Sequence, residues 1–207
     1  MGAIAEEIRK ELEVKDEARE KMLPLCRDSI RYSSTAIRAV HRQEFDEAQK
    51  QIESARRVLA GAEKAVAGCR ELMNTGTVRD AQKELAEANI TLALVTGKKI
   101  PGPEELGVDN AAYLNGLGEA VGEIRRYLLD SMRKGNLSRG EELLSVMDDI
   151  YSVLVTMDFP DALTGGLRRT TDMVRGVLEK TRSDLTLAIQ QKALETKIEK
   201  YQGKVGK

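Results

Sequence analysis

Very few helix-breaking residues interrupt this chain, and that feature most restricts how it can fold. The sequence has 207 residues but four prolines, at positions 24, 101, 103 and 160. An interior proline removes a backbone hydrogen bond and clashes with the preceding helical turn, so the proline-free stretches can form long helices. Aromatic residues make up 3% of the chain and charged residues 32%. This composition favours amphipathic helices over a β-sandwich or barrel.

We therefore predict an all-α fold in which residues 1–207 form a single domain. The expected architecture is a bundle of six to seven long antiparallel helices. The predicted helices cover about residues 4–40, with a bend near Pro24, then 45–72, 78–95, 110–134, 138–159 and 163–200, and a short turn lies at 104–107. Asn74 to Gly76 is a typical helix stop, and Ser138 with Glu141 matches a capping box.

The charge balance and the cysteines limit the functional class and the compartment. The formal net charge of −1 excludes a uniformly basic protein that coats nucleic acid, although it permits a local basic patch. Cys26 and Cys69 have no metal-ligand spacing, so we expect reduced thiols in a reducing compartment. No apolar run approaches the roughly 20 residues of a membrane span, and charges from Glu6 onward do not fit a signal peptide. We expect a soluble, cytoplasmic protein that does not associate with membranes.

Two glutamates on the predicted helix at 110–134 are the first candidate functional residues. The apolar stripe of this helix comprises Leu114, Leu117, Val121, Ile124, Leu128 and Met132. At about 100° per residue, Glu119 and Glu123 lie nearly opposite that stripe. They could be simple solvated glutamates, but Gly116, Gly118 and Gly122 lie beside them, and each helical glycine costs roughly 1 kcal/mol relative to alanine. A helix surface with so few side chains suggests close approach by another backbone, a metal or a ligand.

A second acidic pair, Glu84 and Glu87, lies on one face of the helix at 78–95. That face becomes apolar within two turns, so these acids are expected to line a cavity or a partner surface, with a solvated pair as the alternative. Four carboxylates from two adjacent helices would suit Mg²⁺, which prefers oxygen ligands. A single histidine, His41, cannot build a di-iron Glu-x-x-His site, and His41 with the two cysteines lacks zinc spacing. The sequence contains no Walker A or dinucleotide-binding motif.

The first predicted helix carries a row of arginines. Arg27, Arg31, Arg38 and Arg42 lie within about 60° of one another on the helical wheel. Such a row is commonly a solvated flank, but its regular spacing also provides a track for phosphates. No aromatic residues interleave with it, so recognition through the nucleic-acid backbone and shape is favoured over base stacking.

At these positions the sequence resembles the translin/TRAX family, and its catalytic TRAX branch in particular. The matches are LCRDSI at 25–30, ELAEA at 84–88, YLNGLGEAVGEIRR at 113–126, and the DSM and GN of 130–136. They resemble, in order, the family's Leu-Ser-Arg-Asp-Ile stretch, the Glu-x-x-Glu-Ala pattern, the central Tyr-Leu-x-Gly-Val…Asp-x-x-Gly-Glu-Leu-x-Arg signature and the end of that helix. The order of the long helices agrees across most of the chain, whereas the C-terminal third matches loosely.

The resemblance implies a translin-like α-α superhelix and a Mg²⁺-dependent endoribonuclease. Its acidic residues correspond to Glu84, Glu87, Glu119 and Glu123, with Glu119 standing where TRAX has an aspartate. Glu87 and Glu123 would hold Mg²⁺, or Mn²⁺ in its place. Glu84 and Glu119 would hold water or a second metal, and one of them would accept a proton from the attacking water. The resemblance also implies a hollow homo-oligomer, an octamer, that encloses single-stranded or short duplex RNA, or DNA.

The arginine row would then supply counter-charge along the substrate. Two other functions stay open at this point. The first is a non-catalytic, translin-like protein that binds RNA or DNA and in which the acids are structural. The second is a helical scaffold whose charged faces are only solvated.

Overall fold

Residues 1–73 and 75–205 are described by the computed structural model of the protein, and this part of the chain is helical without β-strands. It contains nine helices, six of them with at least 17 residues, which confirms the all-α prediction. Their bounds are α1 (Gly2–His41), α2 (Phe45–Val66), α3 (Arg70–Met73), α4 (Gly76–Thr96), α5 (Pro103–Leu106), α6 (Asn110–Arg133), α7 (Gly140–Thr156), α8 (Asp161–Thr164) and α9 (Leu167–Val205). No helix in these residues combines the length and the apolar character needed to cross a membrane.

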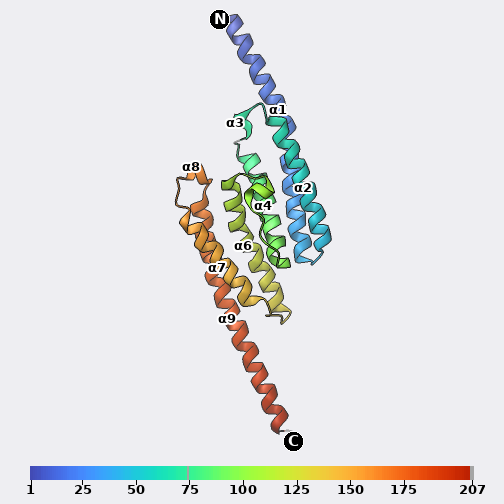
Figure 1. Ribbon diagram of the computed structural model, residues 1–207, viewed down its shortest axis with the longest axis vertical. Coiled ribbons are helices and arrows are strands. Elements are labelled where there is room, and N and C mark those ends of the chain that lie inside the picture. Colours follow the sequence, from blue (N-terminus) through green and yellow to red (C-terminus); the bar gives the residue numbers. More distant parts are fainter. Residues whose placement is uncertain (74, 206–207) are drawn as a thin grey trace.

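Helix α4 lies at the centre of the bundle (Figure 1). It packs against α1 and α2 on one side and α6 on the other, and α6 in turn contacts α7 and α9. Leu85 and Ile90 of α4 have no exposed surface, and most of the apolar segment 90–95 is likewise buried. The α4–α6 pair therefore forms the middle of the molecule, between the α1–α2 hairpin and the α7–α9 pair.

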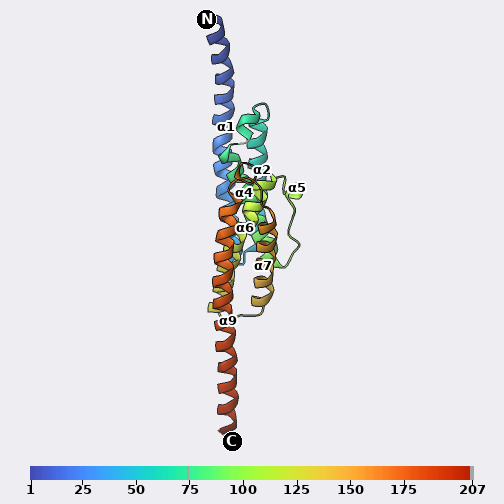
Figure 2. The ribbon, with the colours of Figure 1, turned by 90° about the vertical axis from the view of Figure 1, so that its left-hand side faces the viewer.

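Helices α4 and α6 run in the same direction, because the segment between them returns along the bundle (Figures 1 and 2). Gly97, with a φ of 68°, ends α4 in the left-handed conformation. The guanidinium of Arg139 donates to the carbonyls of Leu94 and Val95 at that end. Asp109 caps α6 by accepting from the Ala111 N–H at 2.8 Å. These contacts fix the register in which the two helices lie side by side.

Several helix boundaries differ from the predictions. Helix α1 runs through Pro24 as one helix, as predicted, but begins at Gly2. Helix α2 ends at Val66, and the short α3 follows it. The predicted helix stop at 74–76 was wrong at Gly76, which begins α4, while Asn74 lies outside the described residues. The predicted capping box was wrong: α7 begins at Gly140, and Ser138 instead donates through its N–H and hydroxyl to the side chain of Asn136.

The long helices extend beyond the bundle at opposite ends of the molecule (Figures 1 and 2). We call residues 1–14, which are Met1 and the start of α1, the N-terminal arm, and residues 186–205 of α9 the C-terminal arm. Every residue of the N-terminal arm is exposed. The exposed apolar residues of the two arms are Ile4, Ile8, Leu12 and Val14 in the first and Leu187, Leu194, Ile198 and Tyr201 in the second. Each arm thus exposes apolar side chains that no other described residue covers.

Candidate functional site

A glycine brings α4 and α6 close together where the predicted acids lie. A Cβ atom placed on Gly116 would lie 2.6 Å from the Lys83 carbonyl oxygen, 2.9 Å from the Ala86 Cβ and 3.1 Å from the Glu87 nitrogen. Only a residue without a side chain fits against the α4 backbone at this distance. Gly116, one of the glycines clustered on α6, therefore permits the close approach of another backbone that the sequence suggested.

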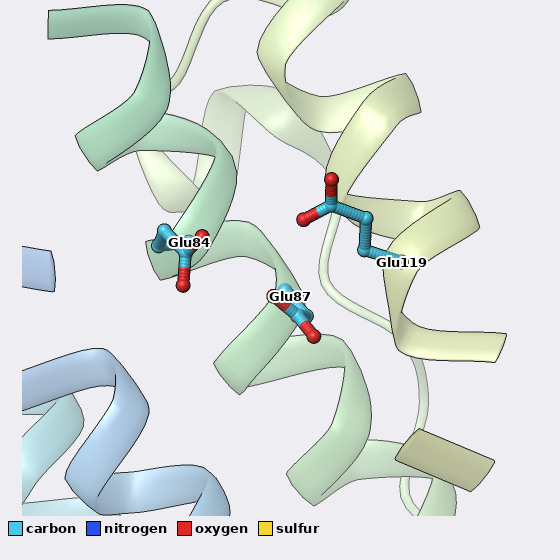
Figure 3. Close-up of side chains that lie close together, drawn as sticks. All are labelled: Glu84, Glu87 and Glu119. Carbon is cyan, nitrogen blue, oxygen red and sulfur yellow. The ribbon is translucent and has the colours of Figure 1, made fainter. Parts of the chain in front are cut away.

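Three of the four predicted acids meet across this contact. Glu84 and Glu87 on α4 and Glu119 on α6 each offer a carboxylate oxygen, and these oxygens lie within 4.8 Å of one another. Figure 3 shows Glu119 extending from its helix toward α4. Glu87 is the most deeply placed, with 8% of its surface exposed, whereas Glu84 and Glu119 are half-buried. We call these three residues the acidic cluster.

The acidic cluster is electrostatically unfavourable without a cation. Burial, together with the charges of Glu84, Glu119 and Glu123, raises the pKa of Glu87 from 4.5 to about 8. Burial also raises the pKa of Glu84, although the neighbouring Lys83 opposes the change. A bound cation would offset this repulsion, and three converging oxygen ligands suit a hard divalent ion such as Mg²⁺. The residues present therefore fit the metal that the resemblance implies.

Lys83 partly neutralises the acidic cluster. Its Nζ lies 2.8 Å from Glu119 Oε1 and 3.8 Å from Glu84 Oε1. Burial lowers the pKa of this ammonium, but the hydrogen bond to Glu119 and the surrounding carboxylates outweigh it, so the pKa is raised. Lys83 was not among the predicted site residues. The signal in the sequence was its position directly before Glu84 and four residues before Glu87.

Glu123, the fourth predicted acid, is not one of the three that converge. Its carboxylate forms a hydrogen bond with Nε2 of His41 at the end of α1, and Arg126 lies 3.9 Å away. The bond to His41 lowers the pKa of Glu123. Glu123 is still near enough to the acidic cluster for its charge to raise the pKa of Glu87.

His41 is a second site residue that sequence reasoning missed. Its side chain is 6% exposed, and within the described residues its Nδ1 is buried without a hydrogen-bond partner. The sequence shows only a single histidine, without the spacing of a di-iron or zinc ligand. Its partner lies 82 residues away on another helix, and no local spacing indicates such a contact.

The four predicted arginines are all exposed, three of them on α1 and Arg42 directly after its end. Arg31 pairs with Asp28 at 2.9 Å and stacks over Tyr32, 5.0 Å from the ring centre. Arg38 donates to two hydroxyls of its own helix, and Arg42 pairs with Glu44. These contacts are local and exposed, so they leave the guanidinium groups accessible. The role of the row as a phosphate track stays a prediction.

Comparison with known proteins gives several full-length similarities. No known protein-family model matches the chain. The uncharacterized protein MJ0175 of Methanocaldococcus jannaschii is 31% identical over 193 residues, which cover 91% of this chain and 84% of that protein. The structure of an AfC3PO complex with duplex RNA is 35% identical with a TM-score of 0.80, and covers 90% of this chain and 97% of its own.

Two further solved structures are similar. A crystal structure of AfC3PO is 34% identical, has a TM-score of 0.79 and covers the same shares of both chains, 90% and 97%. The structure of apo-NeC3PO has a TM-score of 0.78 and covers 91% of this chain and 98% of its own. At 20% identity this last likeness supports the fold alone.

Proposed function

The chain belongs to the translin/TRAX family, and we propose that it is a metal-dependent endoribonuclease that works as a homo-oligomer. The observation that carries the proposal is the convergence of three carboxylates within 4.8 Å at the contact between α4 and α6. RNA is favoured as the substrate because the AfC3PO chain, 35% identical, is described in complex with duplex RNA. DNA is a weaker alternative that no observation favours.

In this proposal Glu84, Glu87 and Glu119 hold Mg²⁺ or Mn²⁺, with Glu123 as the fourth acid. The ion would supply a Lewis acid for the phosphodiester and offset its charge. His41 holds one side of Glu123, and Lys83 balances charge between Glu84 and Glu119. A cluster carboxylate, Glu84 or Glu119, accepts the proton of the attacking water. Arg27, Arg31, Arg38 and Arg42 would contact substrate phosphates outside this centre.

The direct test is incubation of labelled duplex RNA with the purified protein in Mg²⁺, in Mn²⁺ and in EDTA. Cleavage that needs the divalent ion supports the proposal. Tight RNA binding without cleavage under every condition would contradict it and favour the translin-like alternative. One observation favours that alternative: Lys83 already forms an ion pair with Glu119, as in a purely structural network.

Metal affinity is expected to rise with pH up to about 8. Glu87 has a pKa near 8 in the metal-free protein, so at lower pH an incoming ion must displace its proton. The apparent affinity should then increase about tenfold per pH unit between pH 6 and 8. Calorimetric titration with Mn²⁺ in buffers of different ionisation enthalpy would measure both the affinity and the released proton. Glu87→Gln should abolish the release, and an affinity independent of pH in the wild type would contradict the assignment.

The same raised pKa affects the stability of the metal-free protein. Glu87 binds its proton more tightly in the folded than in the unfolded chain, where its pKa is near 4.5. Its contribution to stability is therefore fully present below pH 4.5 and is lost as the pH rises through about 8. Added Mg²⁺ should reverse that loss in the neutral range, because it binds the folded state.

Self-association is proposed from the two arms. Both carry exposed apolar side chains and lie at opposite ends of the molecule (Figure 1). Their charges are complementary: residues 1–14 contain four acidic and two basic side chains, and residues 186–205 contain two glutamates and four lysines. We propose that the N-terminal arm of one copy packs on the C-terminal arm of another. Repeated head-to-tail contacts form a closed ring when the rotation between neighbouring copies adds up to a full turn. Such a ring would be consistent with the expected octamer.

Mutations that place charge on the arms should reduce the mass of the assembly. Ile8→Lys together with Leu12→Lys replaces part of the exposed apolar stripe of α1 and places positive charge against the lysine-rich C-terminal arm. Light scattering should then show a smaller particle than the wild type forms at the same concentration. Val155→Lys is a matched control, because Val155 is also exposed, at 51%, but lies on α7 away from both arms. A wild-type mass for the arm variant would contradict the arm contact.

A further inference from the structure

A polar cavity adjoins the acidic cluster on the side of α9. Its volume is about 430 Å³, and it lies between the first halves of α4 and α6 and the start of α9. The polar side chains that matter for its chemistry are Arg79, Lys83, Asn115, Glu119, Arg169 and Thr170. Lys83 and Glu119 belong to both places, because Glu119 is a member of the acidic cluster and Lys83 is its ion-pair partner. A ligand in the cavity would therefore lie directly beside the proposed metal centre.

The basic groups of the cavity are available to an anion. Within the part of the chain that the structure describes, neither Arg79 nor Arg169 has a carboxylate within ion-pair distance. Asp80 and Glu119 also line the cavity, but Asp80 is exposed and Glu119 is already paired with Lys83. Two guanidinium groups thus remain for a ligand, and guanidinium is the side-chain group that best matches a phosphate in shape and charge.

The wall of the cavity is held in place before any ligand arrives. Gly165 and Gly166, with φ of 61° and 87°, carry the chain from α8 into α9 along the edge of the cavity. Asn115 of α6 donates to the Thr164 carbonyl at 2.8 Å and accepts from the Thr170 hydroxyl at 2.7 Å. This buried amide ties the start of α9 to α6. A cavity fixed in this way loses little conformational entropy when it binds a ligand.

We infer that this cavity binds a phosphate group of RNA next to the phosphodiester held at the acidic cluster. The inference rests on the proposed function and extends it, because it gives the substrate a second point of attachment on the α9 side. Arg79 and Arg169 would contact the phosphate oxygens. Lys83, shared with the cluster, would contribute its positive charge once a cation takes over the neutralisation of Glu119. The phosphate is either an internal phosphodiester or the terminal 5′-phosphate of a short strand.

The test compares arginines that do and do not line the cavity. Arg79→Gln and Arg169→Gln should each weaken the binding of labelled duplex RNA about tenfold, the usual cost of one charge-assisted contact. Each should also reduce the slope of log affinity against log salt by about one. Arg168→Gln is the matched control, because Arg168 neighbours Arg169 in sequence but pairs with Asp158 at 3.2 Å outside the cavity. Arg169→Lys keeps the charge and should retain most of the affinity.

Binding is measured with Ca²⁺ in place of Mg²⁺, so that cleavage does not enter the result. RNAs with a 5′-phosphate and with a 5′-hydroxyl separate the two sources. A loss seen with both RNAs assigns an internal phosphodiester, and a loss confined to the phosphorylated RNA assigns the terminal phosphate. If both cavity variants behave like Arg168→Gln, the inference is wrong, whereas the proposed function stands as long as the wild type cleaves RNA. If the wild type binds no RNA, both fail.

Discussion

Replacement of Glu87 by glutamine is expected to reduce RNA cleavage more than about 100-fold while RNA binding persists. Removal of a metal ligand lowers activity more than removal of a residue that only supports the ligands. Glu87 is 8% exposed and has a carboxylate oxygen within 4.8 Å of those of Glu84 and Glu119, so it is the most buried member of the acidic cluster. Glutamine keeps the shape of the side chain but offers a weaker, neutral ligand. Rates at saturating Mg²⁺, measured with labelled duplex RNA, would give the effect.

The substitution should not harm the fold, which makes the result interpretable. With a pKa near 8, Glu87 is largely protonated at neutral pH in the metal-free protein, and glutamine resembles that form. Asp130→Asn is the matched control, since Asp130 lies on α6 outside the acidic cluster, and its side chain is 43% exposed and pairs with Arg133. Unchanged cleavage by the Glu87 variant would exclude the acidic cluster as the catalytic centre.

Glu123→Gln addresses the fourth acid separately. Glu123 binds His41 and does not belong to the three converging carboxylates. A loss as large as that of Glu87→Gln would mean that Glu123 joins the cluster when the ion binds, as the resemblance implies. A loss of tenfold to 100-fold, in contrast, is typical of a residue that supports the ligands without being one of them.

The sequence predicted the helices well because helix formation depends on residues that are close together in the sequence. The scarcity of proline and the apolar periodicity were sufficient to identify the long elements. The spacing of Glu84 and Glu87 also placed both on one face of α4, and the glycines of α6 indicated a close approach beside Glu119. These features involve residues within one or two turns of each other, where periodicity is informative.

What the sequence could not predict depends on how the helices are arranged. The parallel course of α4 and α6 results from the return of the segment at 97–109, and nothing in the helix patterns records it. The His41–Glu123 bond joins α1 to α6 across 82 residues. The cavity beside Glu119 needs the start of α9, which matched the family only loosely. The nuclease function itself was implied by the resemblance and not by spacing, because acids on one face are equally consistent with a solvated surface.

Gly116 and Gly122 are expected to respond in opposite ways to the same substitution. Gly116→Ala would place its Cβ 2.6 Å from the Lys83 carbonyl, which is backbone and cannot rotate away. Overpacking of this kind costs about 1–3 kcal/mol of unfolding free energy. A Cβ on Gly122 meets no atom within 4 Å, so Gly122→Ala should gain up to about 1 kcal/mol from helix propensity. Urea unfolding of both variants would measure the difference.

The effect at Gly116 should reach the proposed metal centre as well. The added methyl also approaches the Glu87 nitrogen at 3.1 Å, so relief of the clash requires α4 and α6 to separate where their acids converge. Mn²⁺ affinity should therefore fall in Gly116→Ala even under conditions where the variant is folded, and should stay unchanged in Gly122→Ala. Equal behaviour of the two variants in both measurements would show that the spacing of the helices at Gly116 does not control the acidic cluster. The carboxylates would then have to be positioned by other contacts, such as the ion pair of Lys83 with Glu119.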